Sequence, residues 1–174
     1  SDQNKNSYKG MIDFKPFYLT ADFNYEGLSS KNLFNENSIL IDLINSEMLN
    51  NKNLSAKLNL NVKDITNINE LKDLKLKILI EEGNIGFSES TIMWKKDLKI
   101  ILDESFLTLD DGINLIGTIF LDFKNINNFY SSFQIQKEDR KDIKEISIDY
   151  VYNFNDKNFS FNNFKINNKQ NIEL

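Results

Sequence analysis

Hydrophobic and polar residues alternate along most of the chain, which is the pattern of β-strands that bury one face. The strictest run is residues 54–63, in which Leu, Ala and Val at even positions alternate with Ser, Lys and Asn. Similar runs occupy residues 12–25, 74–81, 85–94, 98–109, 113–123, 146–154 and 159–166. Short turns separate most of them, so the pattern predicts an antiparallel meander of about seven to ten strands. The spacing of Phe161 and Phe164 predicts a β-bulge in the last strand.

One segment has a helical period instead. In residues 36–49 the apolar side chains recur on one helical face, at Ile39, Leu40, Leu43, Ile44 and Met48. Asn35 is placed to cap this helix, and Phe34 to pack on its first turn. The predicted fold class is therefore mainly β with one amphipathic helix, an antiparallel meander that forms a curved sheet, a β-groove or a sandwich.

The length of 174 residues corresponds to one domain. Both ends of the chain are polar and aperiodic. We expect a flexible N-terminal segment at 1–9, a single β-rich domain at 10–166 and a flexible tail at 167–174.

Composition excludes several classes of function. The chain has no histidine and no cysteine, which removes the usual general base, the thiol nucleophile and most zinc ligands. The net charge of -5, with Arg140 as the single arginine, argues against a nucleic-acid-binding protein. We therefore predict no enzyme, no catalytic residues, no metal and no cofactor.

Carboxylates are the remaining candidates for catalysis. Asp103 and Glu104 could serve a hydrolase of the two-carboxylate type. Adjacent residues of a strand point to opposite faces, however, so these two side chains are not expected to share a site. No apolar run approaches the roughly 18 residues of a membrane span, and the polar residues 1–7 do not have the pattern that we expect of a signal peptide.

Several strands also carry apolar residues on the second face, at Leu79, Ile101, Ile116 and Phe120. A sheet that is apolar on both sides must be covered twice. One interpretation is a helix on one face and a sandwich core on the other. The alternative is a hydrophobic groove for acyl chains.

The order of the strands carries a family resemblance. It rests on Leu54–Leu60, Leu74–Ile78, the turn and strand from Glu82 through Phe87 to Trp94, and Leu115–Phe123 with its central Gly117. These runs, over residues 35–166, resemble the C-terminal region of AsmA-like proteins of Gram-negative envelopes, with a glycine turn after one strand and an L-x-G-x-(I/L) strand later. The resemblance implies a periplasmic module of a larger protein anchored in the inner membrane and related to TamB, without catalytic residues.

Two functions follow as hypotheses. In the first, the module shields the acyl chains of phospholipids in lipid transport, or supports outer-membrane assembly; the side chains expected to face lipid or core are Leu58, Leu60, Leu76, Ile78, Ile80, Leu115, Ile119 and Leu121. In the second, it is a scaffold domain of the envelope, a β-sandwich that binds an envelope protein or the rest of the parent chain. The candidate docking residues are Trp94, Phe129, Tyr130 and Phe133.

Overall fold

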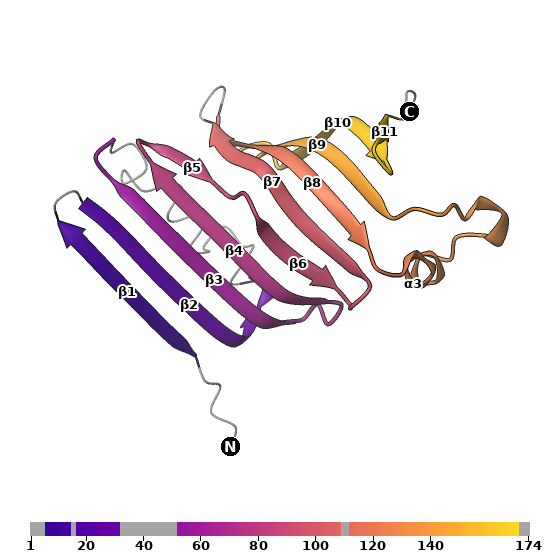
Figure 1. Cartoon of the computed structure of the whole chain (residues 1–174), viewed down its shortest axis with the longest axis horizontal. Coiled ribbons are helices and arrows are strands. Elements are labelled where there is room, and N and C mark those ends of the chain that lie inside the picture. Colours follow the sequence, from indigo (N-terminus) through magenta and orange to yellow (C-terminus); the bar gives the residue numbers. More distant parts are fainter. Residues whose placement is uncertain (1–5, 15–16, 32–51, 109–111, 171–174) are drawn as a thin grey trace, which may run out of the picture.

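The computed structural model describes residues 6–14, 17–31, 52–108 and 112–170. They form one 11-stranded sheet in the order β1-β2-β3-β4-β5-β7-β8-β9-β10-β11, with β6 paired to β4 and β7 (Figure 1). The strands are β1 (Ser7–Phe14), β2 (Phe17–Ser29), β3 (Ser55–Thr66), β4 (Leu71–Glu81), β5 (Asn84–Gly86), β6 (Ser90–Trp94), β7 (Leu98–Thr108), β8 (Asn114–Phe123), β9 (Glu145–Asn153), β10 (Asn158–Ile166) and β11 (Lys169–Gln170). The predicted fold class, a mainly antiparallel curved sheet, is confirmed. Strands extend beyond the predicted 10–166 domain at both ends, because β1 begins at Ser7 and β11 follows residue 166.

The first strands depart from a pure meander. β1 and β2 form an antiparallel hairpin, but β2 and β3 run parallel. Parallel neighbours need a crossover connection of a dozen residues or more, and residues 30–54 provide one. The amphipathic helix predicted for 36–49 falls in this connection and lies outside the described residues.

The turn predicted at Glu82–Asn84 is confirmed. Glu82 (φ 53°) and Gly83 (φ 82°) both have positive φ, as a two-residue hairpin between β4 and β5 requires. The single strand expected from Ile85 to Trp94 is wrong, because β5 and β6 are separate. The Ser90 hydroxyl binds the backbone of Lys77, accepting from its N–H at 2.9 Å and donating to its carbonyl at 3.2 Å. At this point the Ser90 side chain takes the place of backbone hydrogen bonds to β4, so the strand pairing is interrupted between β5 and β6.

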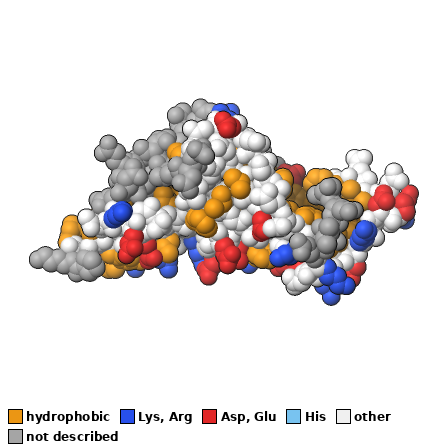
Figure 2. Space-filling model, turned by 90° about the horizontal axis from the view of Figure 1, so that it is seen from above, with side chains coloured by type: hydrophobic (Ala, Val, Ile, Leu, Met, Phe, Trp, Pro, Cys, Tyr) orange, Lys and Arg blue, Asp and Glu red, His pale blue; other side chains and the backbone are white. Residues whose placement is uncertain are grey.

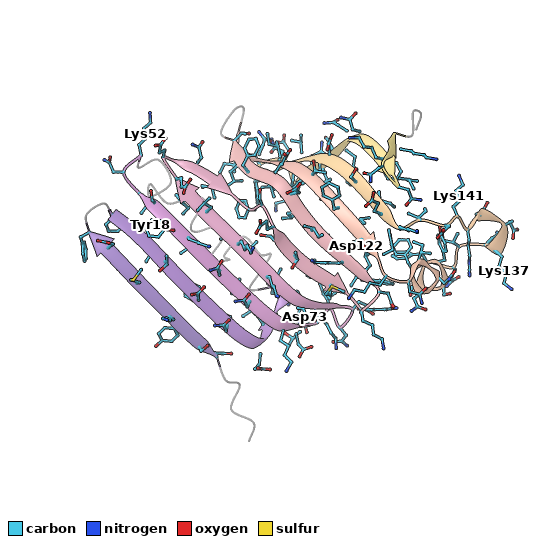
Figure 3. All side chains as sticks on the ribbon, in the orientation of Figure 1. Tyr18, Lys52, Asp73, Asp122, Lys137 and Lys141 are labelled. Atoms are coloured by element: carbon cyan, nitrogen blue, oxygen red, sulfur yellow. The ribbon has the colours of Figure 1, made fainter. Side chains whose placement is uncertain are left out.

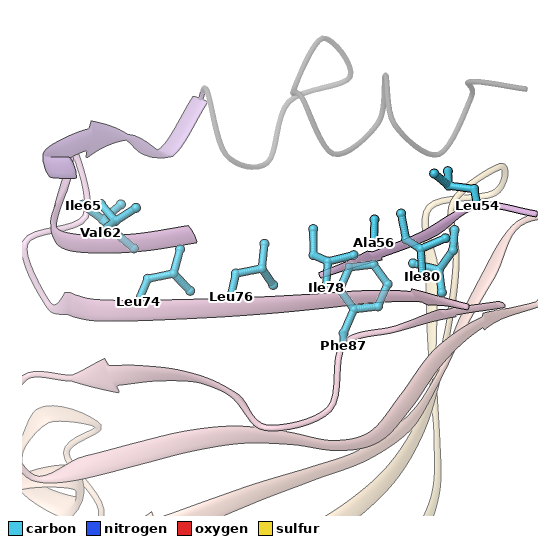
Figure 4. Close-up of a cluster of buried hydrophobic side chains, with 10 residues drawn as sticks. Leu54, Ala56, Val62, Ile65, Leu74, Leu76, Ile78, Ile80 and Phe87 are labelled. Carbon is cyan, nitrogen blue, oxygen red and sulfur yellow. The ribbon is translucent and has the colours of Figure 1, made fainter. Parts of the chain in front are cut away.

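The strand registers sort the side chains onto two faces, which we call the apolar face and the polar face. On the apolar face the cross-strand rows of β2, β3 and β4 are Leu19 with Ala56 and Ile80, Ala21 with Leu58 and Ile78, Phe23 with Leu60 and Leu76, and Tyr25 with Val62 and Leu74. Figure 4 shows the buried members of these rows projecting from one side of β3 and β4. They form the hydrophobic core, in which Ile80 and Val62 are each 1% exposed.

The polar face of the same strands is built from hydrogen-bonded side chains. The Asn59 amide donates to Asp22 at 2.6 Å, the Asn61 amide donates to Asn24 at 2.9 Å, and Lys63 pairs with Glu26 at 2.9 Å. In the space-filling view, basic and acidic side chains gather along the lower edge of the molecule (Figure 2). The sheet is therefore amphipathic across its width, with one side adapted to water.

A bulge in β7 creates a buried polar contact on the apolar face. The pairing of β7 with β8 shifts between Asp103 and Phe106, and Ser105 is 1% exposed at this point. The Tyr150 hydroxyl donates to Ser105 Oγ at 3.1 Å, and Ser105 Oγ donates to the Asp103 carbonyl at 2.9 Å. Burial raises the pKa of Tyr150 above its usual value, while the Ser105 bond acts in the opposite direction.

The C-terminal part begins with the helix α3 (Ile126–Ser132), which is capped by the Asn125 side chain. The 3-10 turn η2 (Lys137–Asp139) then leads to β9 and β10. Lys137 and Lys141 lie in this connection, at the end of the molecule farthest from β1 (Figure 3). The predicted bulge is confirmed, because the β9–β10 register shifts between Asn162 and Phe164.

Asp149 joins three strands at this bulge. Its carboxylate accepts from Asn163 on β10 at 2.9 Å and from Thr118 on β8 at 2.8 Å, and these bonds, with Lys165 nearby, lower the pKa of Asp149 below 3.8. Because the folded-state pKa is depressed, this group stabilises the fold above its unfolded-state pKa, and the contribution is lost as pH falls through the folded-state value.

We therefore expect Asp149→Asn to lower the free energy of unfolding at pH 7 and to flatten its decline as the pH falls below about 4, measured by urea denaturation at each pH. Lys165→Gln removes only the weaker contribution and serves as the control. An Asp149→Asn chain that is as acid-sensitive as the parent would contradict this role.

Candidate functional site

The apolar face continues from the core across the C-terminal strands. Cross-strand rows on β7, β8, β9 and β10 are Ile100 with Leu121, Ile146 and Ile166; Leu102 with Ile119, Ile148 and Phe164; and Leu107 with Leu115, Tyr152 and Phe159. Gly117, Tyr150 and Phe161 form a further row. We call the rows on these four strands the apolar strip. Each of their positions is apolar except Gly117.

The strip is only partly covered. Leu102, Leu107 and Leu115 pack against the buried cluster, whereas Ile119, Leu121 and the residues of β9 and β10 lie beyond it. Phe159 and Phe161 are 40% and 63% exposed, and their rings lie 4.6 Å apart. Phe159 also stacks on Tyr150, with ring centroids 5.4 Å apart. The strip therefore ends in an exposed aromatic rim on β10.

The predicted lipid-facing or core residues all lie on this one face, and the structure divides them. Leu76, Ile78 and Ile80 are buried in the core, with Leu58 and Leu60 packed against it. Leu115 is also packed against the core, and Ile119 and Leu121 belong to the strip. The exposed rings of β10 were absent from the predicted set, although the alternation of Phe159 and Phe161 in the sequence carried the signal.

The apolar residues expected on the second face lie on the polar face, in two separate rows. Leu79, Gly86, Phe106, Ile116 and Val151 follow one another across β4, β5, β7, β8 and β9, and Ile101 pairs with Phe120 in another row. Leu79 is 42% exposed and Phe106 is 44% exposed. Charged and polar residues such as Lys77, Asp103 and Thr118 lie beside these rows, so they form a smaller apolar surface than the strip.

Lysines gather elsewhere on the polar face, which the sequence did not predict. A groove of about 810 Å³ is lined by Lys75, Lys77, Lys95, Lys96, Lys99 and Lys124, together with Asp73, Glu89 and Asp103. Lys77 pairs with Glu89, and this pairing lowers the pKa of Glu89. The lysines come from β4, β7 and two connections, so only the strand order brings them together.

The four predicted docking residues lie together at the end of β8. Trp94 contacts Phe129 and Phe133, with ring centroids 5.8 and 6.0 Å apart. Lys95 Nζ lies 4.5 Å from the Trp94 ring centroid and donates to Ser132 Oγ at 2.8 Å. Phe133 is 57% exposed.

Tyr130 has a different role from the one predicted. It is 6% exposed, and its hydroxyl donates to the Lys141 carbonyl at 2.6 Å and accepts from the Lys141 N–H at 3.1 Å. Its side chain therefore ties α3 to the segment before β9 and is not available for docking.

The candidate site is an apolar surface with few side chains that could react or bind a metal ion. Among the residues that the structure describes, no group of three or more Asp and Glu side chains is placed to hold a metal ion. Asp103 is the last regularly paired residue before the β7 bulge, and Glu104 lies in the bulge with a positive φ of 44°. In the same described part of the chain, no helix combines the length and apolarity needed to cross a bilayer.

Comparison with known proteins gives no relative. No protein-family model matches the chain, and no curated protein or solved structure is significantly similar to it. The arguments for function therefore rest on the geometry described above.

Proposed function

We propose that the chain is a non-enzymatic β-sheet module of a bacterial envelope protein that shields phospholipid acyl chains on its apolar strip. The observation that carries the proposal is the partial exposure of the apolar strip on β8, β9 and β10, in which Tyr150 is buried and which ends at the exposed rings of Phe159 and Phe161. A soluble sheet normally buries such a face completely.

The mechanism needs only apolar contact. Each acyl methylene transferred from water to such a surface gains about 0.8 kcal/mol, so a chain of many methylenes binds without a specific polar partner. The opposite face carries hydrogen-bonded Asn, Asp and Lys side chains and remains in water. AsmA-like envelope proteins, which the sequence resembles, would use such a face in phospholipid transport or outer-membrane assembly, in the periplasm.

Two matched pairs of substitutions test the proposal. The first pair, Phe159→Ser with Phe161→Ser, removes exposed rings from the strip, and the second, Leu79→Ser with Phe106→Ser, removes exposed apolar groups of similar burial from the polar face. All four side chains are at least 40% exposed, so both double variants should fold.

The measurement is native mass spectrometry of the chain after incubation with phosphatidylethanolamine and phosphatidylglycerol vesicles, followed by lipid extraction. We expect one or more bound phospholipids on the parent chain and about a tenfold loss of binding or more for the strip variant, because each phenylalanine contributes about 1.5–3 kcal/mol of apolar contact. The polar-face variant should bind as the parent does. A parent chain without lipid, or equal losses in both variants, would reject the proposal.

The exposed Phe133 favours a second candidate function, the docking of an envelope protein on the aromatic cluster of Trp94, Phe129 and Phe133. Exposed aromatic residues are common centres of protein interfaces. Phe133 lies outside the strip, so Phe133→Ser should leave lipid binding unchanged; a loss of bound lipid in this variant would place the lipid on the aromatic cluster and not on the strip.

A further inference from the structure

The edge strand β1 is unusual in its exposure. All eight of its residues are exposed, among them Tyr8 at 85%, Phe14 at 74%, Met11 at 61% and Ile12 at 51%. β1 is the first strand of the sheet and pairs only with β2 among the described strands (Figure 1). Its outer edge therefore presents a row of backbone N–H and C=O groups beside large apolar side chains.

Natural sheets usually protect such an edge. Short strands, proline, bulges or several lysines are the common means. β1 is regularly paired with β2 along its full length, and it carries one lysine, Lys9. A regularly paired edge of eight residues that exposes large apolar side chains is a template for a further strand.

We propose that β1 pairs with β1 of a second copy of this chain, antiparallel and centred on Met11. A two-fold axis perpendicular to the sheet keeps the apolar faces of both copies on the same side. In such a pair, even-numbered residues of β1 face even-numbered residues of the second copy, and odd-numbered residues face odd-numbered ones. Tyr8, Gly10, Ile12 and Phe14 lie on the apolar face, opposite Phe23, Ala21, Leu19 and Phe17 of β2.

The Met11-centred register is complementary at each position. Lys9 faces Asp13 of the second copy, and Asp13 faces the second copy's Lys9, so two opposite-charge pairs form on the polar face. Tyr8 faces Phe14 of the second copy on the apolar face, twice by symmetry. Gly10 leaves room for the second copy's Ile12, and Met11 faces itself. Such cross-strand aromatic and charge pairs are the stabilising contacts of antiparallel sheets.

Neighbouring registers lose this match. Centring the pair on Gly10 places Lys9 opposite Met11 of the second copy, and centring it on Ile12 places Asp13 opposite Met11. Neither brings opposite charges together within β1. Charge complementarity therefore selects one register and one occupant, and the result is a two-fold dimer with a continuous apolar face. This inference does not rest on lipid binding, since the dimer requires only the edge of β1.

Charge variants of the whole 174-residue chain test the pairing. Lys9→Asp places a carboxylate at both position 9 and position 13, and Asp13→Lys places an ammonium at both. Each variant alone should be monomeric by sedimentation velocity at micromolar concentrations where the parent is a dimer. An equimolar mixture should form a heterodimer, because every facing pair is then of opposite charge. Circular dichroism confirms that each variant is folded.

A disulfide test fixes the register. Antiparallel partners lie about 4.5–5.5 Å apart at Cα, which suits a disulfide, and the chain has no cysteine of its own. Met11→Cys should therefore give a covalent dimer on mild oxidation. Ser7→Cys should not, since its two copies would lie about 27 Å apart along the strands.

A parent chain that is monomeric across the micromolar range would overturn the proposal and leave β1 to a strand of another protein or another segment. Two monomeric variants that do not combine, or a cross-link at position 7 but not at position 11, would overturn the register.

Discussion

Ile80→Ala is expected to lower the free energy of unfolding by about 2–5 kcal/mol, the range for removing a large aliphatic side chain from a packed core. Ile80 is 1% exposed and faces Ala56 on one side and Ile85 on the other. Ala56 is too small to fill the space that the substitution would leave. The loss should be seen as a lower urea midpoint with an unchanged denaturant slope.

The adjacent residue supplies the control. Leu79 occupies the same strand but points to the polar face and is 42% exposed, so Leu79→Ala should change the free energy of unfolding by only about 0.5 kcal/mol. Similar losses for the two variants would show that β4 does not bury its even-numbered face. Phospholipid bound to the apolar strip should stabilise Ile80→Ala and the parent chain by the same amount, because Ile80 belongs to the core and not to the strip.

The sequence predicted the strands well because alternation is a local property. The face of Leu58, Leu60, Leu76, Ile78 and Ile80 could be assigned from period-two spacing alone, and the registers place all five on the same face. Local spacing could not reveal how well each is covered. That depends on position along the sheet, where β3 and β4 carry the buried cluster and β8 lies beyond β5 and β7.

The order of the strands in the sheet could not be predicted either, because it does not follow from the local spacing of apolar residues. The parallel pairing of β2 with β3 depends on the crossover at residues 30–54 and not on either strand. The lysine groove and the aromatic cluster arise from residues far apart in sequence, such as Lys75 with Lys124 and Trp94 with Phe133. Their residue types were visible in the sequence, but their proximity was not.

The β7 bulge was missed because it has no pattern of its own. The run through Asp103, Glu104 and Ser105 interrupts the alternation of apolar and polar residues. The space for Ser105 depends on Gly117 of the neighbouring strand, which has no side chain. Gly117 pairs with Tyr150 on its other side, so a residue without a side chain separates Ser105 from the Tyr150 ring. The glycine of the L-x-G-x-(I/L) strand thus has a packing role.

Gly117→Ala is accordingly expected to destabilise the fold strongly, by about 3 kcal/mol, the upper part of the usual range for overpacking. A Cβ at position 117 would lie 2.3 Å from Ser105 Oγ and 2.6 Å from Ser105 Cα. Rotating the serine could relieve the first clash, but only a backbone shift relieves the second. That shift would also break the bond from the buried Tyr150 hydroxyl to Ser105.

Gly86→Ala is the matched control, because its Cβ would meet Ser105 only at the carbonyl oxygen, at an ordinary 3.8 Å. We expect it to leave the urea midpoint nearly unchanged. Adding Ser105→Gly to Gly117→Ala should recover only part of the loss, since the clash with the backbone of residue 105 remains. Displacement of Tyr150 toward water should also move its raised pKa back toward 10, which an absorbance titration of the tyrosines would detect. Full rescue by Ser105→Gly would show that the clash involves the side chain alone and that the backbones of β7 and β8 do not approach closely here.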